Sequence, residues 1–198
     1  MRGEGRGGNE MESKFIALLR GINVGRAKRV AMADLRALVE DLGYRDVHTL
    51  LNSGNIIFTA PDDSAVNSAA RIEEALSTRL GFSAKVLVLT AVELATIVDD
   101  NPLGEDDRDP SRVLVVFLGN PESRSLLEPL LEKEWNPEVL VLGVNAAYLW
   151  CPDGLLASRM AKAVGQVLGK NSTTRNWATV RKIHGLASNG GKYGKCRT

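Results

Sequence analysis

The stretch FIALLRG, residues 15–21, decides the fold of the first half of the chain. It is an almost continuous apolar run that stops at Gly21, and it predicts a buried β-strand over residues 14–20. Downstream, apolar side chains recur at the i, i+3, i+4, i+7 spacing of one helical face, at Leu35, Leu38, Val39 and Leu42. This spacing predicts a helix over residues 31–42, and Gly43 stands where a C-terminal cap belongs.

A hairpin and a second helix follow this first helix. The predicted strands 47–51 and 55–59 flank Asn52-Ser53-Gly54, which is typical of a tight turn. Residues 64–80 place apolar side chains on one helical face, and the next segment, KVLVL at 85–89, predicts another strand. The resulting order, strand–helix–strand–strand–helix–strand, is that of a ferredoxin-like unit.

The second half of the chain repeats this theme, because VLVVFLG at 113–119 matches FIALLRG at 15–21. The further predicted elements are a helix at 91–99, a strand at 112–118, a helix at 122–133 that Pro129 should bend or interrupt, strands at 139–142 and 146–150, and helices at 156–168 and 176–187. The predicted fold class is therefore α+β: two tandem ferredoxin-like (βαββαβ-type) subdomains with antiparallel sheets, plus a C-terminal helix.

The expected domain organisation follows from composition. It comprises a flexible N-terminal extension at 1–12, a first α+β subdomain at 13–98, an acidic connecting loop at 99–111, a second α+β subdomain at 112–188 and a flexible basic tail at 189–198. Residues 1–10 are either native or precede a true start at Met11, and the sequence leaves both open.

The charge is segregated along the 198 residues, although the formal net charge is only +1. Residues 154–198 hold nine basic side chains and no Asp or Glu, so this segment carries +9 and the remainder −8. A second basic stretch covers residues 14–29, and acidic side chains gather at 99–109. Such segregation is typical of an anion-binding face, although an acidic loop that offsets a basic helical end would produce the same pattern.

Several function classes are excluded by what the sequence lacks. It has no apolar run of about 20 residues and no apolar signal core at its start, so we expect a cytoplasmic protein that does not bind membranes. Its two cysteines cannot form a disulfide scaffold or a four-cysteine zinc site, and no metal site is expected. Phosphate-binding-loop, dinucleotide-binding and hydrolase motifs are missing, so catalytic residues, cofactors and the question of enzymatic activity stay open.

Three polar clusters interrupt apolar elements and are the candidate ligand-binding site. Their candidate residues are Arg20 and Asn23 after the first strand, Asn52, Ser53 and Asn55 at the hairpin turn, and Thr173, Thr174, Arg175 and Asn176 before the last helix. We expect the clusters to converge, so that Arg20 and Arg175 clamp a small anion such as a nucleotide or phosphate compound in a pocket between the subdomains. Asn23, Asn55 and Thr174 would orient this ligand.

Structural explanations of the same residues remain open. Arg20 is also compatible with a solvated strand end, and turn chemistry alone explains the hairpin cluster. In the third cluster, Ser172, Thr173 or Thr174 is a candidate N-cap. Arg175 would then lie in the first helical turn, where the helix dipole disfavours a cation unless an anion binds there.

Two other functions compete with anion binding. A non-enzymatic interaction or regulatory protein is compatible with the composition. A nucleic-acid-binding module is possible because of the +9 segment, but it is not favoured, since only 5% of the residues are aromatic. The oligomeric state cannot be read from the sequence.

The three clusters also carry a resemblance to a known family, the domain-of-unknown-function 1697 family of uncharacterised bacterial proteins. The similar segments are FIALLRGINVG at 15–25, LNSGNIIF at 51–58, AAYLWCPDG at 146–154 and STTRNWATV at 172–180. The resemblance covers about residues 13–187 and implies two related ferredoxin-like α+β subdomains, with no established activity. The chain departs from the family pattern at Cys151 and at Arg26-Ala27-Lys28.

Overall fold

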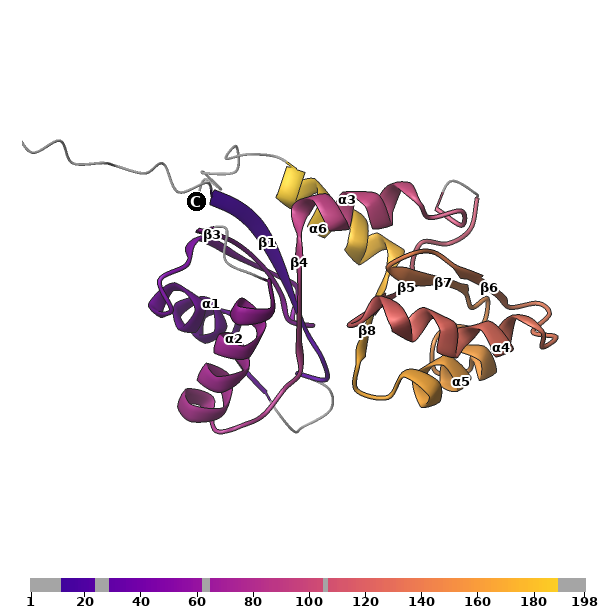
Figure 1. Ribbon diagram of the computed structural model, residues 1–198, viewed down its shortest axis with the longest axis horizontal. Coiled ribbons are helices and arrows are strands. Elements are labelled where there is room, and N and C mark those ends of the chain that lie inside the picture. The colour runs from indigo at the N-terminus through magenta and orange to yellow at the C-terminus, as the bar shows by residue number, and fades with distance from the viewer. Residues whose placement is uncertain (1–11, 24–28, 62–64, 105–106, 189–198) are drawn as a thin grey trace, which may run out of the picture.

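The computed structural model describes residues 12–23, 29–61, 65–104 and 107–188. It has the expected α+β class, with two four-stranded antiparallel sheets and the helices that pack on them (Figure 1). The expected N-terminal extension and basic tail, and the Arg26-Ala27-Lys28 segment, lie outside the described residues, apart from Glu12. Within the four described ranges, no helix has the length and apolar character needed to cross a membrane.

The first sheet has the strand order β2-β3-β1-β4, and all its neighbouring strands are antiparallel. The elements of this half are β1 (Glu12–Leu19), α1 (Met32–Asp41), β2 (Arg45–Leu50), β3 (Asn55–Pro61), α2 (Ala65–Leu80) and β4 (Val86–Thr90). Every strand and helix predicted for this part of the sequence is present, with only small shifts at the ends.

The second sheet has the corresponding order, β6-β7-β5-β8, and is also antiparallel throughout. Its elements are β5 (Val113–Leu118), the 3-10 helix η1 (Pro121–Leu127), α4 (Glu128–Leu131), β6 (Val139–Leu142), β7 (Ala146–Trp150), α5 (Arg159–Leu168) and β8 (Ser172–Asn176). The matching sequences at 15–21 and 113–119 thus provide strands in equivalent positions, because β1 and β5 each lie second from one edge.

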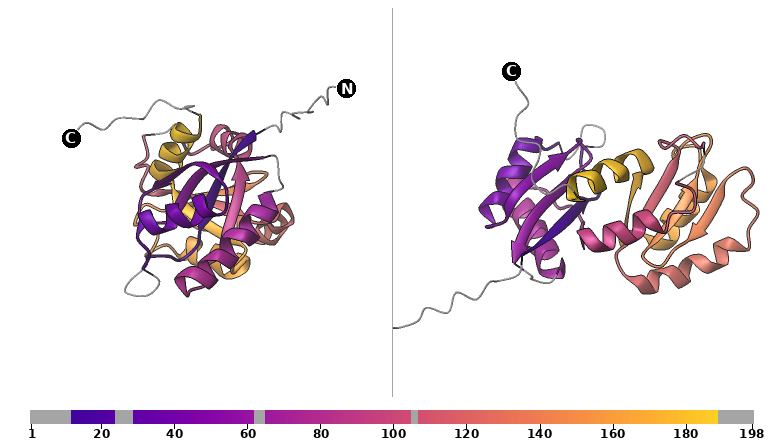
Figure 2. Two further views of the ribbon diagram at one scale, coloured as in Figure 1. Left: turned by 90° about the vertical axis from the view of Figure 1, so that its left-hand side faces the viewer. Right: turned by 90° about the horizontal axis from the view of Figure 1, so that it is seen from above.

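Two further helices, α3 (Ala91–Asp99) and α6 (Trp177–Ser188), lie between the sheets (Figures 1 and 2). They explain why residues 15–19 of β1 are apolar at every position. Phe15, Ala17 and Leu19 pack in the core that α1 and α2 cover, whereas Ile16 and Leu18 pack in the core that contains α3 and α6. Both faces of the strand are buried, so its sequence is a continuous apolar run and not an alternating one.

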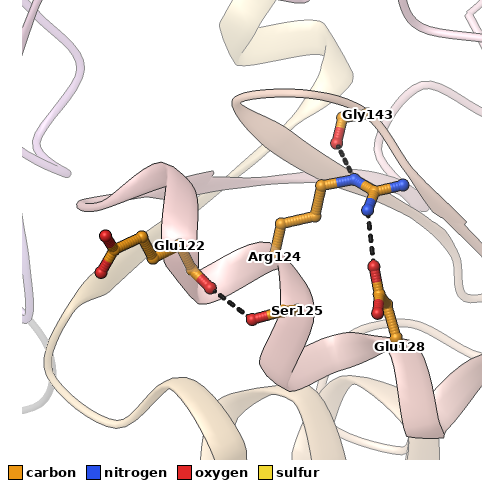
Figure 3. Close-up of polar contacts among 5 residues, drawn as sticks. All are labelled: Glu122, Arg124, Ser125, Glu128 and Gly143. Carbon is orange, nitrogen blue, oxygen red and sulfur yellow. Dashed lines mark hydrogen bonds and ion pairs between the residues drawn. The ribbon is translucent and has the colours of Figure 1, made fainter.

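The segment predicted as one helix over 122–133 is divided in two, as Pro129 suggested. A 3-10 helix covers Pro121–Leu127, and a single α-helical turn follows, with Pro129 near its start, where the missing N–H costs no helical hydrogen bond. Arg124 connects this segment to the β6–β7 turn through a hydrogen bond (Figure 3). Its Nε donates to the Gly143 carbonyl at 3.1 Å, and its Nη1 contacts Glu128 at 2.7 Å.

The described structure corrects the sequence analysis at two places in the second half. The helix expected over 156–168 begins at Arg159, because the Ser158 hydroxyl caps it by accepting from the Ala161 N–H at 2.9 Å. Residues 172–176 are a strand, β8, and not part of a helix start. The N-cap expected among residues 172–174 is therefore wrong: Asn176 caps α6, and its Oδ1 accepts from the Thr179 N–H at 2.9 Å.

Candidate functional site

The three polar clusters meet where the end of β1, the β2–β3 turn and strand β8 come together. Arg175 on β8 joins them, because its Nη2 donates to the carbonyls of Leu19 at 2.8 Å, Ser53 at 3.1 Å and Gly54 at 3.2 Å. These acceptors are more than 120 residues away along the chain. The expected convergence of the clusters is therefore observed.

The Arg175 guanidinium donates all five of its N–H groups to neutral oxygens. In addition to the Nη2 contacts, Nε donates to Asn55 Oδ1 at 2.5 Å, and Nη1 donates to Thr173 Oγ1 and to the Thr174 carbonyl, both at 2.9 Å. The residue is only 8% exposed. No N–H of Arg175 is thus available to a ligand in this arrangement.

Arg175 is also a buried cation with no counter-charge among the described residues. Within the described part of the chain, no carboxylate forms an ion pair with it. Burial lowers the pKa of Arg175 to about 10, so the side chain stays charged at neutral pH. Since Arg175 lies in a strand, the expected conflict with the positive end of a helix does not arise.

The two asparagines expected to orient a ligand are engaged in internal contacts. The fully buried Asn55 donates through Nδ2 to the Leu50 carbonyl at 2.7 Å and to Ser53 Oγ at 3.0 Å, while its Oδ1 accepts from Arg175. Asn23 has φ of +55°, and its amide donates to the carbonyls of Val30 at 3.1 Å and Asn52 at 2.8 Å. Both side chains hold loops in place.

Gly54 lets the β2–β3 turn lie directly against the end of β1. Its φ of +75° is unfavourable for other residues, and an added Cβ would come within 2.6 Å of Ile22 and 2.8 Å of Leu19. The Leu19 N–H donates to the Gly54 carbonyl at 2.8 Å. The small residue thus brings two of the polar clusters into contact.

Arg20 differs from Arg175 because most of its N–H groups have no acceptor among the described residues. It is half-buried, and its Nη1 donates to the Ser172 carbonyl and, at 3.3 Å, to Ser172 Oγ. Among the described residues, nothing accepts from its Nε or Nη2. Arg20 therefore crosses from one half of the chain to the other while keeping donors available for a ligand.

A cleft of about 400 Å³ opens beside Arg20, between the two halves. Its polar and charged side chains are Arg20, Glu73 and Lys85 from the first half and Asn120, Lys170, Asn171, Ser172 and Thr173 from the second, and apolar residues such as Leu18, Val66 and Leu87 also line it. Glu73 is occupied, since it accepts from Lys85 Nζ and from the Val86 N–H, each at 2.9 Å. Three cations and one acid thus give this cleft a net positive charge.

The sequence analysis did not identify Lys85, Lys170 or Asn171 as parts of a site. The internal repeat is one signal in the sequence that points to this region. It aligns Gly119, where the chain leaves β5, with Gly21, where the chain leaves β1. A Cβ at Gly119 would lie 2.8 Å from the Asn171 carbonyl, so only glycine allows this approach. The Gly119 N–H donates to the same carbonyl at 2.8 Å and places Asn171 at the wall of the cleft.

A second cavity, of about 320 Å³, lies on the other side of Arg20. Arg20, Ser172 and Thr173 line both spaces. Of the other expected residues, Ser53, Thr174 and Arg175 line the second cavity. Asn52 contributes its backbone carbonyl to Asn23, and Asn176 caps α6; neither residue lines either of these two cavities.

The described residues offer little for acid–base or metal chemistry. No group of three His, Cys, Asp or Glu side chains in the described ranges is arranged to hold a metal ion. Cys151 is fully buried, and burial raises the pKa of its thiol, which disfavours the nucleophilic thiolate.

Comparison with known proteins adds a family and a related structure. The family model described as "Protein of unknown function (DUF1697)" matches residues 12–148. A solved structure of the conserved bacterial protein SP0830 from Streptococcus pneumoniae is similar, with a TM-score of 0.74 and 25% sequence identity. The match covers 90% of this chain and 100% of that one. No curated protein matches the chain.

Proposed function

The chain belongs to the DUF1697 family of proteins of unknown function, and we propose that it binds a small anionic ligand in the cleft between its two halves. The observation that carries this proposal is Arg20. Its guanidinium is fixed through one nitrogen by Ser172, and the Nε and Nη2 groups have no acceptor among the described residues. A planar fork of this kind matches the oxygens of a phosphate or carboxylate.

The charge of the cleft supports an anion as the ligand. Lys85 and Lys170 line the same cleft as Arg20, and Glu73 is the one acid among the described residues that line it. Because Glu73 already pairs with Lys85, the charges of Arg20 and Lys170 are left to attract a ligand. Walls of one sign concentrate ions of the opposite sign and increase their rate of association.

Arg175 has a positioning role in this proposal. It holds β8 against the β1 end and the β2–β3 turn through its contacts with Leu19, Ser53 and Asn55. Ser172, the anchor of Arg20, lies at the start of the same strand. The buried arginine therefore sets the distance between the two halves, and the exposed donors of Arg20 meet the ligand.

The test is calorimetric titration with inorganic phosphate, a nucleoside monophosphate and a sugar phosphate. We expect binding by the wild-type protein and an affinity about ten- to hundredfold weaker in Arg20→Ala, because charge-assisted hydrogen bonds contribute about 1.5–3 kcal/mol. Lys170→Ala, at an exposed position, should weaken binding less. The control is Arg36→Ala, on the outer face of α1, where Arg36 pairs only with Glu40 at 2.7 Å.

Absence of binding to all three anions, or equal affinity in wild type and Arg20→Ala, would overturn the proposal. RNA binding with a steep salt dependence that Arg20→Ala leaves intact would favour the nucleic-acid alternative.

We also infer three finer assignments that go with this function: the fold of each half, its bounds and the location of the protein. Each half is a ferredoxin-like unit, which the βαββαβ chain order and the matching strand orders of the two sheets support. The units extend over residues 13–98 and 112–188, and residues 99–111 connect them. The proposed location is the cytoplasm.

A further inference from the structure

We infer that the ligand is an amphipathic anion, with a phosphate or carboxylate head at Arg20 and an aliphatic or aromatic group in the second cavity. This inference rests on the proposed function and extends it to the class of ligand. The key observation is that Arg20, Ser172 and Thr173 form a wall shared by the charged cleft and the second cavity. An anion held at Arg20 is therefore adjacent to both.

The second cavity has a continuous set of apolar side chains along part of its wall. Its walls include Leu114, Val116 and Leu149 from one face of the second sheet, and Ala161 and Val164 from α5. Leu155, which is 49% exposed, also lines it. Its volume of about 320 Å³ falls at the lower end of the range for small-molecule sites, which is about 300–1,000 Å³, and such sites combine apolar walls with few polar groups.

Among the described residues that line this cavity, one charged group, the Arg20 guanidinium, has N–H donors without an acceptor. Arg175 lines it, but all five of its N–H groups are donated to protein oxygens. Thr173 Oγ1 is one of these acceptors. Among the described residues that line the cavity, Arg20 is thus the cation with donors to spare, and the space beyond it favours an apolar group.

Gly165 keeps this cavity open. It lies inside α5, where glycine is among the poorest helix formers, yet no positive φ requires it there. A Cβ added at Gly165 would meet no atom within 4 Å, so close packing does not require glycine either. Gly165 lines the cavity, and a large side chain at this position would enter the space that we assign to the apolar group.

The experiment compares inorganic phosphate with hexyl phosphate and phenyl phosphate by calorimetric titration. We expect the wild-type protein to bind at least one of the two esters ten times or more tighter than inorganic phosphate, and the preferred ester shows whether the group is aliphatic or aromatic. Gly165→Leu should remove this preference and leave the affinity for inorganic phosphate unchanged. Gln166→Leu places the same side chain on the exposed neighbour, outside the cavity lining, and should behave as wild type.

The outcomes separate the two proposals. Equal affinity for the esters and inorganic phosphate, or an ester preference that survives Gly165→Leu, overturns the apolar subsite while anion binding at Arg20 stands. Failure of all three compounds to bind overturns both. Because leucine favours helix more than glycine does, Gly165→Leu should stay folded, and its thermal midpoint verifies this.

Discussion

Arg175 shows how a charged residue can be accommodated in a protein interior although no acid of the described residues pairs with it. Its charge is spread over a planar group, and each N–H meets an oxygen of Leu19, Ser53, Asn55 or the neighbouring threonines. Backbone carbonyl dipoles supply much of this solvation. The arrangement is specific, because a lysine ammonium has only three donors and no fixed fork.

Replacing this residue should destabilise the fold strongly. Arg175→Met leaves the buried Asn55 Oδ1 and the Leu19 carbonyl without a major donor, and a buried unsatisfied group costs about 1–3 kcal/mol. We expect the free energy of unfolding in urea at pH 7 to fall by about 3 kcal/mol or more, and by a similar amount in Arg175→Lys. Arg36→Met, at an exposed helical position, should change it by less than about 0.5 kcal/mol. If Arg175→Met were as stable as wild type, the prediction would be wrong. The free energy gained from the Arg175 hydrogen bonds would then only equal the cost of moving its charge out of water.

At the residue scale, the sequence predicted which polar clusters meet but not the contacts within them. The convergence of Arg20, Asn55 and Arg175 was predicted because polar residues interrupt apolar elements at all three places. The acceptors of Arg175 could not be predicted from the sequence, because they are mostly backbone carbonyls, which every residue has. Lys85 and Lys170 were missed for a related reason: an exposed lysine is common on any surface, and only the fold places these two on one cleft.

Strand β8 is the element that the sequence pattern could not predict. Its residues, STTRN, include no aliphatic or aromatic side chain, although Ser172, Thr173 and Arg175 are buried. It is a strand because it completes the hydrogen bonding of β5, in register from Leu114–Asn176 to Leu118–Ser172. Pairing with a neighbouring strand here outweighs local β-propensity. In contrast, β1 and β5 were predictable because both of their faces are buried.

Helix α3 has a side-chain hydrogen bond at each end. The stabilisation that the C-terminal one provides should depend on pH. At its start, Thr90 and Glu93 form a capping box. Near its end, the Ile97 carbonyl accepts from the Tyr148 hydroxyl of β7 at 2.8 Å. Burial, together with the negative charge of Asp100, raises the pKa of Tyr148 well above its ordinary value of 10.

Tyr148 should therefore make stability fall at alkaline pH. Above pH 10 the tyrosine of the unfolded chain loses its proton while the folded one keeps it, so the free energy of unfolding decreases by about 1.4 kcal/mol per pH unit. Tyr148→Phe should be about 1 kcal/mol less stable than wild type at pH 8, and this difference should shrink between pH 10 and 11. Urea unfolding at each pH measures both. A difference that stays constant with pH would show that the folded tyrosine titrates normally.

At the scale of the whole molecule, the two halves are joined by a common core. The cluster around α3 and α6 contains Ile16 and Leu18 of the first sheet together with Val115, Phe117 and Tyr148 of the second. Each sheet packs its other face against its own helices. The sequence analysis predicted two tandem units, but periodicity reports only whether a face is apolar and not which element covers it. The shared core could therefore be recognised only from the structure.

A shared core predicts that the two halves unfold together. The three tryptophans all follow β4 in the chain: Trp135 and Trp150 report on the second half, and Trp177 reports on the shared core. Far-ultraviolet circular dichroism also detects α1 and α2 of the first half. We expect both signals to show one urea transition with the same midpoint, because exposing either half would expose the α3–α6 core of the other. Two midpoints would mean that this core does not couple the halves, and hydrogen exchange at β1 and β5 would then assign the weaker one.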